Sequence, residues 1–240
     1  MVKAAANSAK KRPAGIAIAK TSAAGKAPWY SKFVGANNTE YMRYMRDEWG
    51  WEKRGDRALF EKLCLEGQQA GLSWATILAK RQAYRKAFAG FDLKKCASMS
   101  EKNIGRILSA TAAGPGGRDA VICNKLKLLS IPRNARSVLA LRTSPYNDPK
   151  TGAVHRSLDS LLWSFVGGAP IVNDVTSPAQ MPVMSQTARD MSRILKKLGF
   201  VFVGPTICYS LMQSCGLVID HPVGTPEYKA AVGRLRKRQR

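Results

Sequence analysis

The apolar residues of this chain recur with a helical spacing almost everywhere from Trp29 onward. One such run, opened by Ser157 and closed by Gly167-Gly168, places apolar side chains at positions i, i+3, i+4 and i+7: Leu158, Leu161, Leu162 and Phe165. No stretch of the sequence alternates apolar and polar residues as a half-buried strand does. The pattern therefore predicts an all-α protein of about eight helices, arranged in two lobes around a cleft.

A serine cap and two glycines divide the central part of the chain. Ser73 is expected to cap a helix that begins with Trp74. Just before it, Gly67 and Gly71 predict a break between two helices. We therefore expect Glu66 and Trp74 to lie at the ends of adjoining helices and to face a common space.

The chain is strongly basic, with 39 Lys and Arg residues against 16 Asp and Glu residues and a net charge of +23. Residues 1–28 and 229–240 each hold six basic residues and no acidic one, which leaves 27 basic and 16 acidic residues in 29–228. Such a surface attracts polyanions, and nucleic acid is the first candidate. We expect a disordered basic arm (1–28), a folded domain (29–228) and a basic C-terminal tail (229–240).

The two basic ends allow several interpretations. They are solvated ends that keep the protein soluble, or they are arms that add affinity for nucleic acid and act as a nuclear localisation signal. The N-terminal arm also fits a mitochondrial transit peptide, because it is rich in Ala and Lys and lacks acidic residues. We expect the nucleus as the compartment, with the mitochondrion as the alternative.

The apolar runs are short. The run from Leu161 to Val166 falls far below the roughly 20 residues that a membrane-spanning helix needs. The five cysteines are odd in number and form no Cys-x-x-Cys pair, which argues against a disulfide framework. We expect a soluble, intracellular monomer with no membrane partner.

One stretch combines a carboxylate with several aromatic rings. Tyr41, Tyr44 and Trp49 precede Glu66, and Trp74 follows it. The plain interpretation is a solvent-facing Glu on a helix, with the aromatic residues in the core. The alternative is a nucleobase pocket, in which the rings stack on the base and the carboxylate meets the donors on its edge. A cationic, alkylated base would also gain cation–π contacts and a counter-charge.

Longer strings resemble a known family. Five strings resemble the bacterial 3-methyladenine DNA glycosylase I family and follow one another in the same order as in that family. They are EWG (48–50), LCLEGQQAGLSW (63–74), WSFV (163–166), LKKLGF (195–200) and FVGPTICYSLMQSCGLVIDH (202–221). The resemblance spans residues 29 to 225. It implies a helix-hairpin-helix glycosylase fold and a repair enzyme that flips 3-methyladenine out of alkylated double-stranded DNA and hydrolyses its N-glycosidic bond.

The resemblance also implies roles for individual residues. Glu66 matches the pocket carboxylate, which acts through hydrogen bonding and electrostatics because the methylated base is already a good leaving group. The base-contacting positions are Tyr41, Tyr44, Trp49, Trp74 and Ser210. No lysine stands at a motif position that would suggest Schiff-base lyase chemistry, so the abasic site is expected to stay uncut. Two alternatives stay open: a non-catalytic DNA-binding protein with a vestigial glycosylase core, and a glycosylase for another alkylated purine.

The chain departs from the family at its zinc site. Members bind a structural zinc through an N-terminal Cys, a His after the Tyr-x-x-Tyr pattern, and a His and a Cys near the C-terminal end. Here Met45 replaces the first His, no Cys precedes Cys64, and Thr225 stands where the last Cys is expected, so that His221 alone remains. One imidazole cannot make a four-ligand site. We expect no zinc and no other cofactor, with apolar packing around Met45 instead.

The second departure lies in the predicted DNA-binding hairpin, whose short turn is expanded to residues 114–119. Gly116 and Gly117 would let backbone N–H groups approach a phosphate, and Lys125 and Lys127 would add positive charge. The alternative is an ordinary surface loop with an insertion. Leu72, in the glycine-flanked turn before Trp74, is a candidate wedge for the gap that a flipped base leaves.

Overall fold

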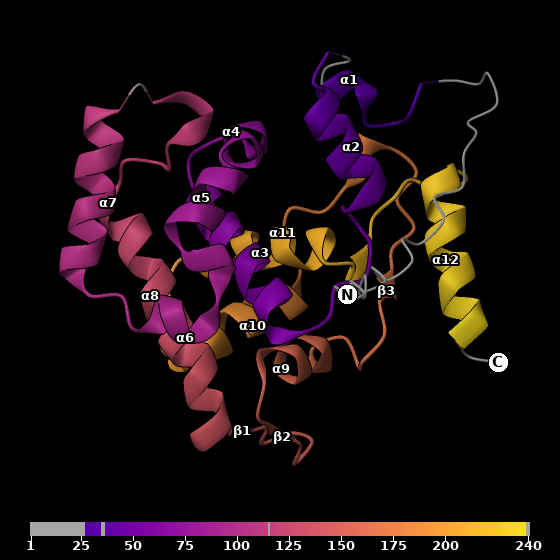
Figure 1. Ribbon diagram of the computed structural model, residues 1–240. Helices are drawn as coiled ribbons and strands as arrows, with labels where there is room; N and C mark the ends of the chain where they lie inside the picture. Colours follow the sequence, from indigo (N-terminus) through magenta and orange to yellow (C-terminus); the bar gives the residue numbers. More distant parts are fainter. Residues whose placement is uncertain (1–26, 35–36, 115, 239–240) are drawn as a thin grey trace, which may run out of the picture.

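A computed structural model describes residues 27–34, 37–114 and 116–238 of the chain (Figure 1). The all-α prediction is confirmed for these residues, which form more helices than the eight or so that were expected. The helices are α1 (Ser31–Val34), α2 (Thr39–Asp47), α3 (Asp56–Gln69), α4 (Trp74–Ala79), α5 (Arg81–Ala87), α6 (Leu93–Ala97), α7 (Glu101–Ala113), α8 (Lys125–Thr143), α9 (Leu158–Ser164), α10 (Gln186–Lys197), α11 (Pro205–Ser214) and α12 (Pro226–Arg238). Single 3-10 turns follow α5, precede α8 and precede α10, at Ala89–Phe91, Gly117–Asp119 and Pro178–Gln180.

The strands in the described part of the chain are two residues long and form two small ladders. Strands β1 (Tyr146–Asn147) and β2 (Val154–His155) pair antiparallel, and β3 (Ile171–Val172) pairs parallel with β4 (Val218–Ile219). The parallel pair joins the loop after α9 to the segment after α11. The strands therefore tie loops together and do not form a separate layer.

Helix α3 lies at the centre of the molecule, between α7 and α8 on one side and α1, α2 and α12 on the other (Figure 1). It packs against α4, α8, α9 and α11. Its apolar side chains Leu59, Phe60 and Leu63 have no exposed surface. Burying a side chain of this size stabilises the fold by about 1.5–3 kcal/mol, so the helix that carries Glu66 is a rigid support.

The glycines around the end of α3 have different roles from those expected. Gly67 lies within α3 and does not break it; a Cβ there would meet Cβ of Phe202 at 3.0 Å and its carbonyl oxygen at 3.2 Å. Gly71, with φ +73°, makes the break. Ser73 then caps α4 as predicted, accepting a hydrogen bond from the Thr76 N–H at 3.2 Å. Glu66 and Trp74 thus stand at the facing ends of two helices.

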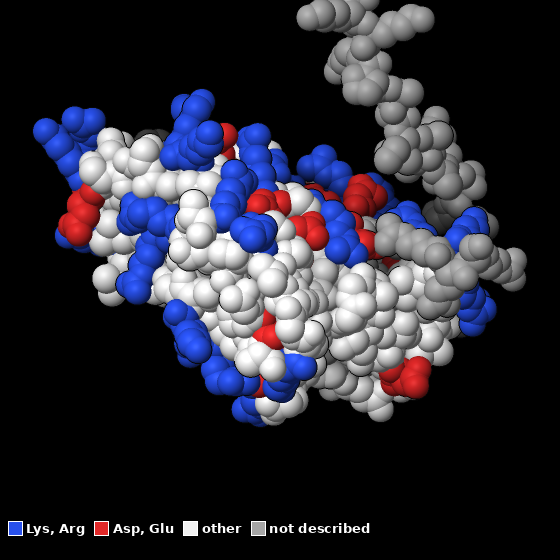
Figure 2. Space-filling view, turned by 90° about the horizontal axis from the view of Figure 1, so that it is seen from below, with Lys and Arg blue, Asp and Glu red and all other residues white. Residues whose placement is uncertain are grey.

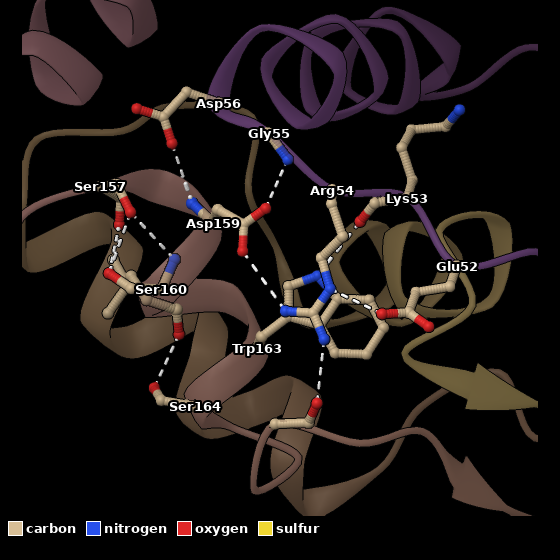
Figure 3. Close-up of polar contacts among 12 residues, drawn as sticks. Glu52, Lys53, Arg54, Gly55, Asp56, Ser157, Asp159, Ser160, Trp163 and Ser164 are labelled. Atoms are coloured by element: carbon tan, nitrogen blue, oxygen red, sulfur yellow. Dashed lines mark hydrogen bonds and ion pairs between the residues drawn. The ribbon is translucent and has the colours of Figure 1, made fainter. Parts of the chain in front are cut away.

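The N-terminal end of α3 is anchored to α9 by Arg54 (Figure 3). Its guanidinium carbon lies 3.7 Å from the ring centroid of Trp163, and its nitrogens donate to the Gly168 carbonyl oxygen at 2.9 Å and to Asp159 at 3.3 Å. Asp159 also accepts a hydrogen bond from the Gly55 N–H. These contacts fix the direction in which α3 enters the core.

The C-terminal end differs from the expected basic tail. Residues Pro226–Arg238 form α12, whose Ala231 is buried and whose Arg234 lies 4.1 Å from the ring centroid of Trp51. The predicted N-terminal arm lies outside the described residues up to residue 26. In the described part of the chain, no helix is both long enough and apolar enough to span a membrane.

Candidate active site

Glu66 lies in the last turns of α3 and is almost completely enclosed, with 4% of its surface exposed. The Ser214 hydroxyl, at the end of α11, donates a hydrogen bond to Glu66 Oε1 at 2.7 Å. The ammonium of Lys62 lies 3.3 Å from the same oxygen. The interpretation of Glu66 as a solvent-facing helix residue is therefore wrong: it is a buried carboxylate with a cation and a donor beside it.

Lys62 was not predicted as a site residue, and the structure puts its ammonium at the centre of the site. Nζ donates a hydrogen bond to the Tyr44 hydroxyl at 2.8 Å and lies 4.8 Å from the centroid of that ring. It also lies 4.3 Å from the ring centroid of Trp74. Its only signal in the sequence is its place four residues before Glu66, which puts both on one face of a helix.

The predicted stacking residues come together around this ammonium. The rings of Tyr44 and Trp74 lie 5.3 Å apart between centroids, at 43°, and those of Tyr41 and Tyr44 lie 6.1 Å apart, at 50°. Burial, and after it the charge of Glu66, raises the pKa of Tyr44 well above its ordinary value, and the same two causes raise the pKa of Tyr41. Both hydroxyls therefore keep their protons at neutral pH and can donate hydrogen bonds.

A cavity of about 310 Å³ adjoins this cluster. Three of the predicted residues line it, Tyr41, Trp49 and Ser210. Its other walls come from the segment before α1, from α2 and α11, and from the segment between β3 and α10: Trp29, Met45, Thr206, Gln213, Pro178, Met181, Pro182 and Val183. Glu66, Tyr44 and Trp74 do not line the cavity and are buried, with at most 8% of their surface exposed. The six predicted residues thus fall into two groups: Tyr41, Trp49 and Ser210 line the cavity, whereas Glu66, Tyr44 and Trp74 are buried.

A buried carboxylate that the sequence did not indicate holds one wall of the cavity. Asp220 accepts hydrogen bonds from the Tyr209 hydroxyl at 2.8 Å, from Gln213 Nε2 at 2.8 Å and from Asn173 Nδ2 at 2.6 Å. Because Gln213 lines the cavity, this network fixes one of its walls.

The surroundings of His221 do not fit a zinc ion. Its imidazole is fully buried among the rings of Trp29, Trp49 and Trp51, whose centroids lie 6.0, 5.1 and 6.0 Å away. Neither ring nitrogen has a hydrogen-bond partner among the described residues. Burial lowers the pKa of His221 from 6.5 to about 4. No group of three or more His, Cys, Asp or Glu suited to a metal ion exists in the described part of the chain, and the indole rings around His221 are not zinc ligands.

The predicted DNA-binding residues fall into two groups. Leu72 is 40% exposed in the turn between α3 and α4, and Lys125 is exposed at the start of α8. Gly116 and Gly117 have φ of +72° and +68° in the turn between α7 and α8, which only glycine adopts easily. These four positions are compatible with contact to DNA, and that role stays a prediction.

Lys127 has a different role from the predicted one. Its ammonium is buried and donates hydrogen bonds to the carbonyl oxygens of Gln68, at 2.9 Å, and Ala70, at 2.6 Å. Desolvation lowers the pKa of Lys127. The side chain therefore caps the C-terminal end of α3, where carbonyl groups lack helical partners, and it does not face a phosphate.

A basic groove of about 750 Å³ lies between α2 and the turn before α8. Arg43, Arg46 and Arg118 line it, and Arg118 pairs with Glu40 at 2.8 Å. These arginines are not among the predicted site residues, although Arg43 and Arg46 are three residues apart on the helix that carries Tyr44. On the face seen in Figure 2, which is viewed from below Figure 1, Lys and Arg lie mainly along the edges, around a broad uncharged area.

Comparisons with known proteins point in one direction. A family profile described as methyladenine glycosylase matches residues 34–228. A DNA-3-methyladenine glycosylase of Haemophilus influenzae is 40% identical over 196 residues, covering 82% of this chain and 94% of that protein. DNA-3-methyladenine glycosylase 1 of Escherichia coli is 40% identical over 186 residues, covering 77% of this chain and 89% of that protein.

Solved structures are similar as well. A crystal structure of 3-methyladenine DNA glycosylase I has a TM-score of 0.68 and 39% identity, covering 79% of this chain and 94% of that one. A variant of 3-methyladenine DNA glycosylase I in complex with 3-methyladenine has a TM-score of 0.71 and 30% identity, covering 83% of this chain and 97% of that one.

Proposed function

The chain belongs to the methyladenine glycosylase family, and from this premise we propose that its buried carboxylate and aromatic rings receive 3-methyladenine flipped out of alkylated DNA. The protein is a DNA-3-methyladenine glycosylase, a hydrolase that releases the damaged base in excision repair. The observation that carries this proposal is Glu66: a buried carboxylate, held by Ser214, beside the rings of Tyr44 and Trp74.

Cleavage of the glycosidic bond does not need a strong general acid. Methylation makes the base cationic, so when the bond between C1′ of the sugar and N9 of the base breaks, both electrons go to the base and neutralise it. The positive charge passes to the sugar, and a water molecule adds to C1′ and gives up a proton. The protein has to hold the base, orient it and exclude bulk water.

Each residue then has a defined task. Glu66 accepts hydrogen bonds from the donor edge of the base, while Tyr44 and Trp74 offer ring faces for stacking. The hydroxyls of Tyr41 and Tyr44 stay protonated and donate to ring nitrogens. Because water attacks C1′ in this mechanism and no amine does, the product is an intact strand with an abasic site.

The test is the identity of the released base. Methylated DNA is incubated with the wild type, Glu66→Gln and Trp74→Ala, and the supernatant is analysed by liquid chromatography and mass spectrometry. The wild type should release 3-methyladenine; Glu66→Gln should be slower by about 100-fold and Trp74→Ala by about tenfold or more.

Folded wild type that releases no 3-methyladenine would contradict the proposal. Release of another alkylated purine in its place would support the alternative of a changed substrate range. The DNA is then gel-analysed without heat or base: an uncut strand supports hydrolysis alone, and strand cleavage contradicts it.

Three further properties belong to this proposal. We expect the protein to act as a monomer on double-stranded DNA and to hold no zinc, so that chelator leaves its melting temperature unchanged. We expect a nuclear location, with the mitochondrion as the alternative. Fluorescent fusions of the full chain and of a chain that lacks residues 1–26 would separate these compartments.

A further inference from the structure

The site contains a cation of its own, the Lys62 ammonium. A site for a cationic base would be expected to contain only aromatic rings and a carboxylate. The Lys62 ammonium contacts Glu66 at 3.3 Å and Tyr44 at 2.8 Å, and it lies within 5 Å of two ring centroids. Only 5% of the Lys62 side chain and 3% of the Glu66 side chain are exposed. The two charges therefore face each other away from water.

Each carboxylate of this region has a cation beside it, and Lys53 adds a further positive charge near Glu48 and Cys215. The Lys62 ammonium balances the Glu66 carboxylate, and the nearby Glu48 carboxylate is balanced by Arg81 at 2.6 Å. The other titratable groups that face Glu66 are Tyr41 and Tyr44, whose hydroxyls burial keeps protonated, and Cys215, whose pKa burial raises to about 11.

An unbalanced carboxylate would work against the reaction. The base carries a positive charge before the glycosidic bond breaks and none afterwards. A lone buried carboxylate stabilises the charged base more than the neutral leaving base, so it tightens binding of the intact substrate and slows bond cleavage. A site that recognises the base edge with a carboxylate therefore gains from a second, positive charge.

We propose that Lys62 is the resident counter-ion of the base site: its ammonium cancels the charge of Glu66, so that the site binds the base by shape and hydrogen bonds without stabilising the positive charge that must leave it. This inference rests on the proposed function. It makes Lys62 a positioning and electrostatic residue, and it assigns it no attack on the sugar.

Lys62 also fixes the geometry of both neighbours. Ser214 and Lys62 both contact Glu66 Oε1, and among the described residues no hydrogen bond reaches Oε2. That second oxygen is left to accept from a base. Because Lys62 donates to the Tyr44 oxygen, the hydroxyl proton of Tyr44 is free to point elsewhere and to be donated.

The test compares two ligands that differ in charge. Neutral 3-methyladenine and the permanently cationic 3,9-dimethyladeninium are titrated onto the full-length wild type, Lys62→Met and Lys62→Arg, with tryptophan fluorescence as the signal. Lys62→Met removes the charge and keeps an unbranched side chain. It should raise the ratio of cation affinity to neutral-base affinity by about tenfold or more, whereas Lys62→Arg should keep the wild-type ratio.

Two further variants separate charge from folding. Lys62→Met/Glu66→Gln leaves neither charge and should return the affinity ratio toward the wild-type value, which a purely structural role of Lys62 would not do. Lys94→Met, at an exposed position on α6, is the matched control and should leave the ratio unchanged. Circular dichroism melts establish that each variant is folded.

The kinetic arm uses single-turnover excision of 3-methyladenine. Lys62→Met should lower the maximal rate and should also lower, or leave unchanged, the half-saturating enzyme concentration. An affinity ratio that stays at the wild-type value in folded Lys62→Met overturns the inference, as does a maximal rate equal to that of the wild type. A wild type that binds both ligands but excises nothing refutes the proposed function instead, because the ligand ratios do not depend on turnover.

Discussion

Lowering the pH should remove the stabilisation that neutral, buried His221 gives the folded protein. The imidazole has no exposed surface, and burial lowers its pKa from 6.5 to about 4. The folded protein therefore binds a proton at this position more weakly than the unfolded chain does. The contribution of His221 is fully present above pH 6.5 and is lost as the pH falls toward 4. With these two values, the free energy of unfolding falls by about 2 kcal/mol between pH 7.5 and pH 5.

The assay is urea unfolding of the wild type and His221→Phe at a series of pH values in this range. Carboxylates and other groups that titrate in both proteins cancel in the difference between their free energies of unfolding. That difference should move in favour of the variant by about 2 kcal/mol as the pH falls from 7.5 to 5. A difference that is constant across the range would refute the argument, and so would an NMR titration of His221 with its midpoint near pH 6.5.

Other perturbations test other parts of the structure. Gly50→Ala should destabilise the protein by about 1–3 kcal/mol more than Gly55→Ala. Both glycines have positive φ, but only at Gly50 would the new Cβ meet His221 Nε2, at 2.5 Å. Equal melting temperatures of the two variants would contradict this prediction. Lys127→Met should lower the free energy of unfolding by about 1–3 kcal/mol without changing the salt dependence of DNA binding. Arg43→Ala should have the opposite signature, a normal melt and a slope of log affinity against log salt that is smaller by about one; an unchanged slope would remove Arg43 from the DNA-binding surface.

The helix caps could be predicted from the sequence because both hydrogen-bond partners lie within a few residues of each other. Ser73 and Ser157 cap helices through hydrogen bonds to backbone groups three residues ahead, so the sequence alone contains both partners. The adjoining positions of Glu66 and Trp74 follow from the break at Gly71 for the same reason.

The buried lysines could not be predicted because their partners are distant in the sequence. Lys127 is fixed by carbonyl groups at the end of α3, almost sixty residues earlier, and Lys62 is fixed partly by Tyr44 on α2. A lysine in a helical sequence is usually solvated, and nothing near it in the chain marks these two as enclosed. The prediction that Gly67 breaks α3 was wrong for a related reason. Glycine is needed there because Phe202 comes close to its backbone, and not because the helix ends.

The C-terminal basic segment illustrates a different difficulty. Its charge suggested a solvated tail, yet α12 docks through Ala231 and through the stacking of Arg234 on Trp51. Arginine buries its stem and its flat guanidinium against an aromatic face while staying charged, so a run of arginines is compatible with packing.

The most direct test of the account is the structure of the protein with 3-methyladenine bound. The base is predicted to stack against Trp74 or Tyr44, with a donor of its edge within hydrogen-bond distance of Glu66 and with Lys62 still beside that carboxylate. Glu66→Gln should bind the base more weakly. A base found only in the cavity lined by Trp49 and Ser210, out of reach of Glu66, would contradict the central claim that this carboxylate recognises the damaged base.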